Sequence, residues 1–121
     1  MNLHPISHAA TRPDHPAVIM TGSGEQMSYG ELDAAANRLA NLLQSRGMGP
    51  TEAGGDAFAV LLENRPEFYV LNWGSQRVGT MLVPVSTRLT GPEIAYILKD
   101  SEAKLLVSST RFAGVLEAIR S

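Results

Sequence analysis

The sequence predicts an α/β fold, an incomplete layer of mostly parallel strands with flanking helices and an N-terminal hairpin. Three observations support this class. Short apolar runs alternate with stretches whose apolar residues recur every three or four positions. Residues 57–62 are apolar throughout, as a parallel strand buried on both faces requires. Two pairs, Ser28 with Glu31 and Thr90 with Glu93, have the spacing of a capping box, which marks a helix start.

The first part of the chain is predicted to form the hairpin and an amphipathic helix. Residues 17–20 read as a strand, residues 21–24 as a turn, and residues 25–28 as the returning strand. The helix starts at Ser28 and ends at Gly47, a natural C-cap. Its apolar face, which should pack on a sheet, comprises Leu32, Ala35, Ala36, Leu39, Leu42 and Leu43.

The rest of the chain is predicted to alternate strands with helices. Strands are expected at residues 57–62, 81–85 and 104–107. Helices are expected from Pro66 to Gly79, from Thr90 through Leu98, and along a final stripe of Phe112, Val115, Leu116 and Ile119. Such alternation favours a parallel sheet with right-handed crossovers.

Composition excludes several classes of protein. With 121 residues, of which 44% are hydrophobic, the chain fits one domain with a real core. The 10 basic and 12 acidic residues are interspersed, so no nucleic-acid or polybasic membrane surface is indicated. Cysteine is absent, which excludes disulfides, a thiolate nucleophile and cysteine-bound zinc. The N-terminus lacks a signal-peptide pattern, and the longest apolar run is far shorter than a membrane span of about 20 residues. We therefore expect a cytoplasmic protein.

Two polar segments are candidates for nucleotide-binding or capping elements. Residues 22–24, Gly-Ser-Gly, follow a strand, but no helix opens directly after them and no lysine follows nearby. A hairpin turn is the favoured interpretation, and a phosphate loop is the alternative. Residues 108–110, Ser-Ser-Thr, contain no glycine and are expected to cap the last helix.

The three histidines all lie near the N-terminus. His4 and His8 have the i, i+4 spacing used by some metal sites, but no third ligand is indicated. The favoured interpretation for His4, His8 and His15 is therefore exposed side chains in a frayed segment. A serine nucleophile on a Gly-x-Ser-x-Gly elbow is also not indicated, since that motif does not occur.

An ordered series of segments extends the interpretation beyond fold class. It includes His-Pro-Ala-Val-Ile at 15–19, Ser-Tyr-Gly-Glu-Leu at 28–32, Ala-Asn-Arg-Leu-Ala at 36–40, residues 55–64, Pro-Glu-Phe at 66–68, Gly79, Pro-Val at 84–85, Arg-Leu-Thr at 88–90, Glu93, and Ala-Tyr-Ile-Leu-Lys-Asp-Ser at 95–101. In this order the segments resemble the opening of the AMP-binding family, which holds acyl-CoA synthetases, luciferases and peptide-synthetase adenylation domains. The resemblance implies an N-terminal lead at residues 1–14 and, at residues 15–121, the truncated N-terminal part of an AMP-binding domain. The implied fold is the N-terminal subdomain of the acyl-CoA synthetase-like fold.

The resemblance also implies a chemistry for the parent enzyme. The segment most similar to bacterial fatty-acyl or aryl CoA ligases comprises residues 63–68, Trp73, Gln76 and Arg77. Such ligases use ATP, Mg²⁺ and coenzyme A: a carboxylate attacks ATP to give an acyl-adenylate and pyrophosphate, and the coenzyme A thiol then displaces AMP. The family's phosphate loop, adenine and ribose motifs and catalytic lysine follow the part present here, and neither Lys99 nor Lys104 lies in such a motif. We expect no catalytic residue, metal ligand or cofactor for this chain alone, and predict that it is inactive.

Arg88 is the candidate ligand contact in the parent enzyme. Within Ser-Thr-Arg-Leu-Thr at residues 86–90, it matches the arginine of the family's Asn-Pro-Arg-Leu-like motif, which in some CoA ligases lies near the coenzyme A phosphates. A guanidinium suits this role because it stays charged and binds phosphate oxygens through two parallel donors. Alternatively, Arg88 pairs with a surface carboxylate or caps a turn. The chain departs from the motif at Ser86 and Thr87, and its link at residues 50–56 is longer than the family's Pro-Gly-Asp, as a surface insertion would be.

Three hypotheses about function follow. The leading one is a truncated ATP-dependent acyl-CoA ligase whose partners are a carboxylic acid, ATP and coenzyme A, with no nucleic acid and no membrane span. The second is a non-catalytic interaction module that self-associates, because faces meant to pack on the rest of an enzyme would remain apolar. The third, a free-standing nucleotide-binding α/β enzyme, requires the turn at residues 22–24 to bind phosphate.

Overall fold

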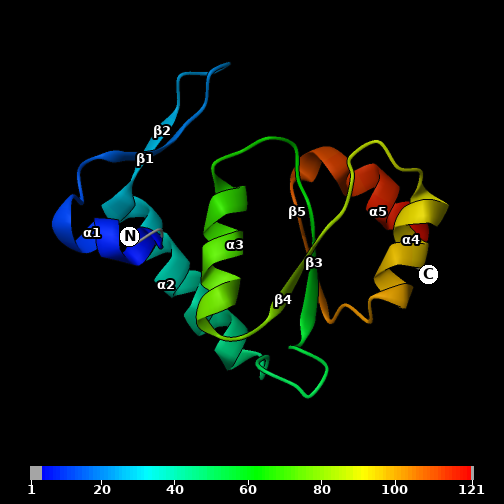
Figure 1. Ribbon diagram of the computed structural model, residues 1–121. Coiled ribbons are helices and arrows are strands. Elements are labelled where there is room, and N and C mark those ends of the chain that lie inside the picture. The colour runs from blue at the N-terminus through cyan, green and yellow to red at the C-terminus, as the bar shows by residue number, and fades with distance from the viewer. Residues whose placement is uncertain (1–3, 121) are drawn as a thin grey trace. The chain divides into compact units, whose positions relative to one another are not determined.

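The structure, a computed structural model, describes residues 4–120 and consists of two units. Within the described range, the first unit comprises residues 4–48 and 65–78, and the second comprises residues 49–64 and 79–120. Figure 1 labels the helices and strands of both units. The chain therefore passes from one unit to the other after residues 48, 64 and 78.

The first unit opens with a short helix and a hairpin. Helix α1 (Pro5–Thr11) precedes strands β1 (Pro16–Ile19) and β2 (Gln26–Ser28), which pair antiparallel. The Met20 N–H donates to the Glu25 carbonyl oxygen at 2.8 Å and closes the turn between the strands. The predicted hairpin is confirmed. A strand follows the Gly-Ser-Gly turn, so this turn lacks the strand-to-helix geometry of a phosphate loop.

Helix α2 (Tyr29–Ser45) starts and ends as the sequence predicts. At its start, the Ser28 hydroxyl accepts from the Glu31 N–H and the Glu31 carboxylate accepts from the Ser28 N–H, both at 3.1 Å. These two bonds form the capping box. At its end, Gly47 has a φ of 75° and donates its N–H to the Gln44 carbonyl oxygen at 2.9 Å. Glycine adopts this left-handed conformation without strain, which ends the helix.

Helix α3 (Glu67–Arg77) packs along α2 at very short range. A Cβ atom on Gly74 would lie 2.7 Å from Leu39 Cδ2 and 3.0 Å from the Ala36 carbonyl oxygen. The two helices therefore approach this closely only because residue 74 has no side chain. The apolar face of α2 was expected to lie on a sheet, but its main neighbour is α3.

The second unit is built on a three-stranded parallel sheet. Strand β3 (Ala57–Leu61) is central, between β4 (Met81–Pro84) and β5 (Leu105–Ser108), as Figure 1 shows. Every residue of β3 is buried, in agreement with its unbroken apolar run. The predicted α/β class, with a parallel layer and an N-terminal hairpin, is confirmed.

Helices α4 (Gly91–Asp100) and α5 (Ala113–Ile119) pack against this sheet. The buried centre of this packing consists of Ala59, Leu61, Val85 and Ile94. The Glu93 carboxylate accepts from the Thr90 N–H at 3.0 Å, so α4 starts where the sequence predicts. No helix within residues 4–120 is long and apolar enough to cross a membrane.

The link that precedes β3 is held by specific polar contacts. Gly55 has a φ of 139°, and a Cβ atom there would lie 2.3 Å from the Gly79 carbonyl oxygen, so only glycine fits. Next to it, the Asp56 carboxylate accepts from Lys104 Nζ at 2.8 Å and from the Gly49 N–H at 3.0 Å. The bond from Lys104, followed by that from Gly49, lowers the pKa of the Asp56 carboxyl. The predicted surface insertion is thus joined to the residue that precedes β5.

Candidate functional site

The carboxyl ends of the three parallel strands lie at one edge of the sheet and lead to polar side chains. Glu63 follows β3, Arg88 follows β4, and Ser109 follows β5. The strand order β4-β3-β5 means that successive strands are added on opposite sides of β3. In open parallel sheets, ligands bind outside the carboxyl ends of the strands where the strand order reverses in this way. This carboxyl edge is therefore the candidate binding site.

Arg88 lies in the turn that leaves β4 at this edge. Its side chain is exposed, and its backbone N–H donates to the Ser86 hydroxyl at 3.3 Å, which stabilises the turn. Within residues 4–120 its guanidinium has no ion-pair or hydrogen-bond partner. The N–H donors of the positively charged Arg88 guanidinium are therefore available to an anionic ligand.

Glu63 and Ser109 join two neighbouring loops at the same edge. The Ser109 hydroxyl donates to Glu63 Oε2 at 2.7 Å in a partly buried bond. Residues 108–110 were expected to cap the last helix, and this expectation is wrong. Ser109 precedes a 3₁₀ turn (Thr110–Phe112), but its hydroxyl bonds to Glu63 instead of capping the turn. The bond fixes the loop after β5 to the loop after β3. Glu63 was not predicted as a site residue, and its one available signal was its position just after the buried strand.

The N-terminal histidines contact aromatic rings, so the interpretation as a frayed segment is wrong, although the His15 side chain is exposed as expected. His4 is the N-cap of α1, where its Nδ1 accepts from the Ile6 N–H at 3.1 Å. The His4 ring lies 4.9 Å from the Trp73 ring, in an edge-to-face arrangement at 72°. His8 lies 5.0 Å from the Tyr29 ring. Helices α2 and α3 therefore supply aromatic surface that orders the segment.

No metal site is assembled by these histidines. His8 Nδ1 lies 3.2 Å from an Arg12 guanidinium nitrogen, a cation that repels a bound metal ion. Among residues 4–120, no three histidine, cysteine or carboxylate side chains gather where they could hold a metal ion. The histidine contacts thus serve the docking of α1.

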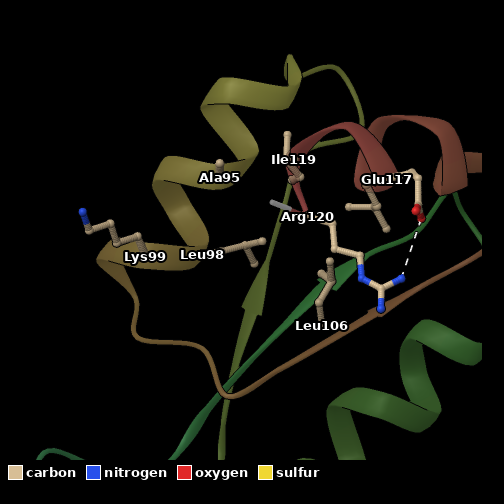
Figure 2. A pocket seen from close by; sticks show the side chains of 8 residues that line it. Ala95, Leu98, Lys99, Leu106, Glu117, Ile119 and Arg120 are labelled. Carbon is tan, nitrogen blue, oxygen red and sulfur yellow. Dashed lines mark ion pairs between the residues drawn. The ribbon is translucent and has the colours of Figure 1, made fainter.

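An apolar groove lies between α4 and α5, alongside β5. Its volume is about 700 Å³. Figure 2 shows Leu98, Leu106 and Ile119 directed into the groove, whereas Lys99 points away from it. Arg120 forms a long ion pair of 4.0 Å with Glu117 at the rim. The groove can take an apolar group, but it presents no catalytic arrangement of side chains.

Comparison with protein families gives a match over nearly the whole chain. The model of the family described as AMP-binding enzyme matches residues 7–120. The match starts well before His15, where the resemblance was expected to begin, and so includes most of α1. Most of the docked helix therefore lies within the matched region.

Similar proteins and structures agree with this match. The long-chain-fatty-acid–CoA ligase FadD13 of Mycobacterium tuberculosis is 35% identical over 113 residues, which cover 93% of this chain and 22% of that protein. The fatty acid–[acyl-carrier-protein] ligase ScoC of Streptomyces coeruleorubidus is 37% identical over 91% of this chain and 20% of that protein. The inhibitor-bound N-terminal domain of FACL13 from Mycobacterium tuberculosis has a TM-score of 0.86 and 33% identity, over 97% of this chain and 28% of that one. The chain thus spans about a fifth of the length of the curated relatives it matches.

Proposed function

The chain belongs to the AMP-binding enzyme family, and from this premise we propose that it is the N-terminal part of an ATP-dependent acyl-CoA ligase. The observation that carries the proposal is similarity over nine-tenths of the chain to proteins named as fatty-acid ligases. The parent enzyme would convert a carboxylic acid and ATP into an acyl-adenylate and pyrophosphate. It would then transfer the acyl group to coenzyme A and release AMP.

The substrate proposed for the parent is a fatty acid, with coenzyme A as the acceptor. FadD13 and FACL13 are both from Mycobacterium tuberculosis, FadD13 is named as a long-chain-fatty-acid–CoA ligase, and the FACL13 domain has a TM-score of 0.86 to this chain. ScoC is named for an acyl-carrier-protein acceptor. Its similarity therefore supports a fatty acid as the substrate, but it does not support coenzyme A as the acceptor. A cytoplasmic location, where ATP and coenzyme A are supplied, accords with this proposal.

We propose that the residues that the structure describes do not form a site for Mg²⁺ and ATP. Within residues 4–120 no metal-binding group of side chains is formed. Of the two lysines, Lys104 is engaged by Asp56, and Lys99 points away from the groove in Figure 2. We therefore propose that the parent binds Mg²⁺ and ATP through other residues, and that the 121-residue chain alone forms no acyl-adenylate.

A pyrophosphate-release assay tests the inactivity. The purified chain would be incubated with ATP, Mg²⁺ and carboxylic acids from acetate to palmitate, beside intact FadD13 as the positive control. We expect release from FadD13 only. Turnover by the chain that scales with its concentration and persists after repurification would refute the proposed inactivity.

The proposed role of Arg88 is to bind a phosphate of coenzyme A. Its support is the exposed guanidinium at the carboxyl edge, without a partner in the described residues. The test is a chimera in which this chain replaces the matching part of FadD13. Arg88→Ala should raise the KM for coenzyme A about tenfold, as loss of one charge-assisted contact predicts. The rate of acyl-adenylate formation should stay within twofold of the unmodified chimera, since coenzyme A takes no part in this half-reaction. Equal losses in both half-reactions would contradict the role, and Arg38→Ala, at an exposed position in α2, serves as a charge-matched control.

A second candidate, a self-associating module, is favoured by the apolar groove between α4 and α5. Light scattering of the chain over a hundredfold range of concentration would show a rising mean mass. Leu116→Glu, which puts a charge into the groove, should restore the monomer mass. A constant monomer mass for the unmodified chain would exclude this candidate.

A further inference from the structure

We propose that the groove between α4 and α5 binds a single-chain fatty acid, separately from the candidate site at the carboxyl edge of the sheet. Glu63, Arg88 and Ser109, which mark that edge, do not line the groove. The groove has a volume of about 700 Å³. Small-molecule sites in proteins measure about 300–1,000 Å³ and have a mostly apolar lining with a few polar groups that orient the ligand. The size of the groove therefore suits a small amphiphilic molecule.

The walls of the groove are aliphatic. They are formed by the half-buried side chains of Ala95, Leu98, Leu106, Leu116 and Ile119. The four larger side chains pack on the buried apolar cluster of the second unit, so one side of each is fixed and the other remains open. A hydrocarbon chain in the groove would cover the open side and remove further apolar surface from water.

The positions of the walls are set by contacts outside the lining. A Cβ atom on Gly91 would lie 3.1 Å from Ile119 Cγ2, so α4 and α5 already touch beside the groove. Leu106 belongs to β5, which pairs with β3 in the sheet. Binding to such a preformed groove orders few protein groups, which lowers the entropic cost of binding.

The lining favours an acyl chain over a peptide. A peptide brings backbone N–H and C=O groups, each of which needs a hydrogen-bond partner once it leaves water. The five aliphatic side chains of the walls offer no such partner. An acyl chain has no polar group along its length, so it enters the groove without leaving one unpaired.

The charges at the rim favour an acidic end group. Among the described residues that line the groove, Lys99, Glu117 and Arg120 are charged and carry a net charge of +1. Arg120 pairs with Glu117 at 4.0 Å, and their side chains are 81% and 77% exposed, so this pair contributes little to stability. The Arg120 guanidinium is thus able to exchange Glu117 for a ligand carboxylate, which it would bind through two parallel donors. Lys99 points away from the groove in Figure 2 and provides a matched control.

Calorimetric titration of the 121-residue chain with octanoate, nonanoate and decanoate tests the acyl chain. The protein is kept at a concentration at which light scattering finds monomers, because a second chain in the groove would compete. Each added methylene should lower the Kd about fourfold. Decyltrimethylammonium, which has a similar chain and the opposite charge, should bind at least about tenfold more weakly than decanoate. Amide NMR shifts should change in α4, α5 and β5 and stay constant in α2.

Two matched pairs of variants locate the acyl chain and its carboxylate. Ala95→Phe fills the groove and should raise the Kd for decanoate at least about tenfold, whereas Ala118→Phe, at an exposed position of α5 outside the lining, should not change it. Arg120→Gln should raise this Kd about tenfold, and Lys99→Gln less than about twofold. Unchanged α2 amide shifts would show that each variant is folded.

Several results would overturn the proposal. They are the absence of decanoate binding, a Kd that does not depend on chain length, or equal effects within either pair of variants. A capped amphipathic helical peptide with leucine at every third or fourth position serves as the competing probe. If this peptide binds the groove more tightly than decanoate, the groove is a peptide site and the fatty-acid assignment is wrong.

Discussion

The contacts that stabilise each unit internally differ between the two units. In the second unit, a buried apolar cluster around Ile94 joins two helices to a parallel sheet. In the first unit, α2 and α3 meet through a glycine, and Arg77 pairs with Asp33 beside the contact. An apolar cluster tolerates changes of shape better than changes of volume, whereas a close helix contact tolerates neither. The units should therefore respond differently to the same kind of substitution.

The largest effect is expected in the apolar cluster of the second unit. Ile94 is 2% exposed, so Ile94→Ala removes buried methyl groups and leaves a cavity. It should lower the free energy of unfolding by about 2–5 kcal/mol, measured by urea denaturation. Tyr96→Ala, two residues along α4 at a site that is 69% exposed, should change it by about 0.5 kcal/mol or less. Equal effects at the two positions would show that the cluster does not hold this unit.

The next prediction is that a glycine-to-alanine substitution in a helix lowers stability in the first unit and raises it in the second. Gly74→Ala places a methyl group against Ala36 and Leu39 and should destabilise by about 1 kcal/mol net, since a gain in helix propensity offsets part of the overpacking. Gly114→Ala in α5 meets no atom within 4 Å and should stabilise by about 0.5–1 kcal/mol. Thermal unfolding of both variants measures the difference. Two changes of the same sign would contradict the close contact at Gly74.

A smaller effect concerns the charged pair of the first unit. Asp33 and Arg77 have side chains 28% and 13% exposed. A double-mutant cycle with Asp33→Ala and Arg77→Ala should give a coupling free energy of about 1 kcal/mol. The same cycle at Arg65 and Glu67, whose side chains are 43% and 54% exposed, should give about 0.5 kcal/mol or less. A larger coupling at the exposed pair would reverse this ranking.

The smallest effect is the acid response at Asp56 in the second unit. Its pKa is lowered in the folded chain by Lys104 and Gly49, so the ionised form stabilises the fold above the unfolded pKa of about 3.8. This contribution is lost as the pH falls through the lower, folded pKa. Asp56→Asn should therefore reduce the slope of urea midpoint against pH below about pH 4. Arg38→Gln, at an exposed position in α2 of the first unit, should leave that slope unchanged.

The parts of the fold that follow from short-range patterns were predictable. The capping boxes at Ser28 and Thr90 depend on residues three positions apart, and the structure contains both. Burial of β3 follows from its continuous apolar run. Gly47 ends α2 because its left-handed conformation suits glycine. In each case the physical cause lies within a few residues of its effect.

The contacts that were missed join residues far apart in the chain. Ser109 bonds to Glu63 only because β3 and β5 are neighbours in the sheet. Helix α1 lacks a usual N-cap residue, and its docking depends on Trp73 from α3. The one local signal for α1 was Pro5, since proline is common in the first turn of a helix. At the candidate site, the motif at residues 86–90 identified Arg88 as a candidate. No sequence pattern predicted the bond between Ser109 and Glu63 that joins two loops at the same edge.

The strand order β4-β3-β5 has a consequence for synthesis of the chain. Strand β3, whose residues are all buried, is made before the other two strands of this sheet, yet its second edge pairs with β5, which is made after β4. While the ribosome adds α3, β4 and α4, one edge of β3 has no partner. An unpaired apolar edge is a site where chains aggregate. Slow translation before residue 105 should therefore lower the yield of folded protein more than slow translation after residue 108.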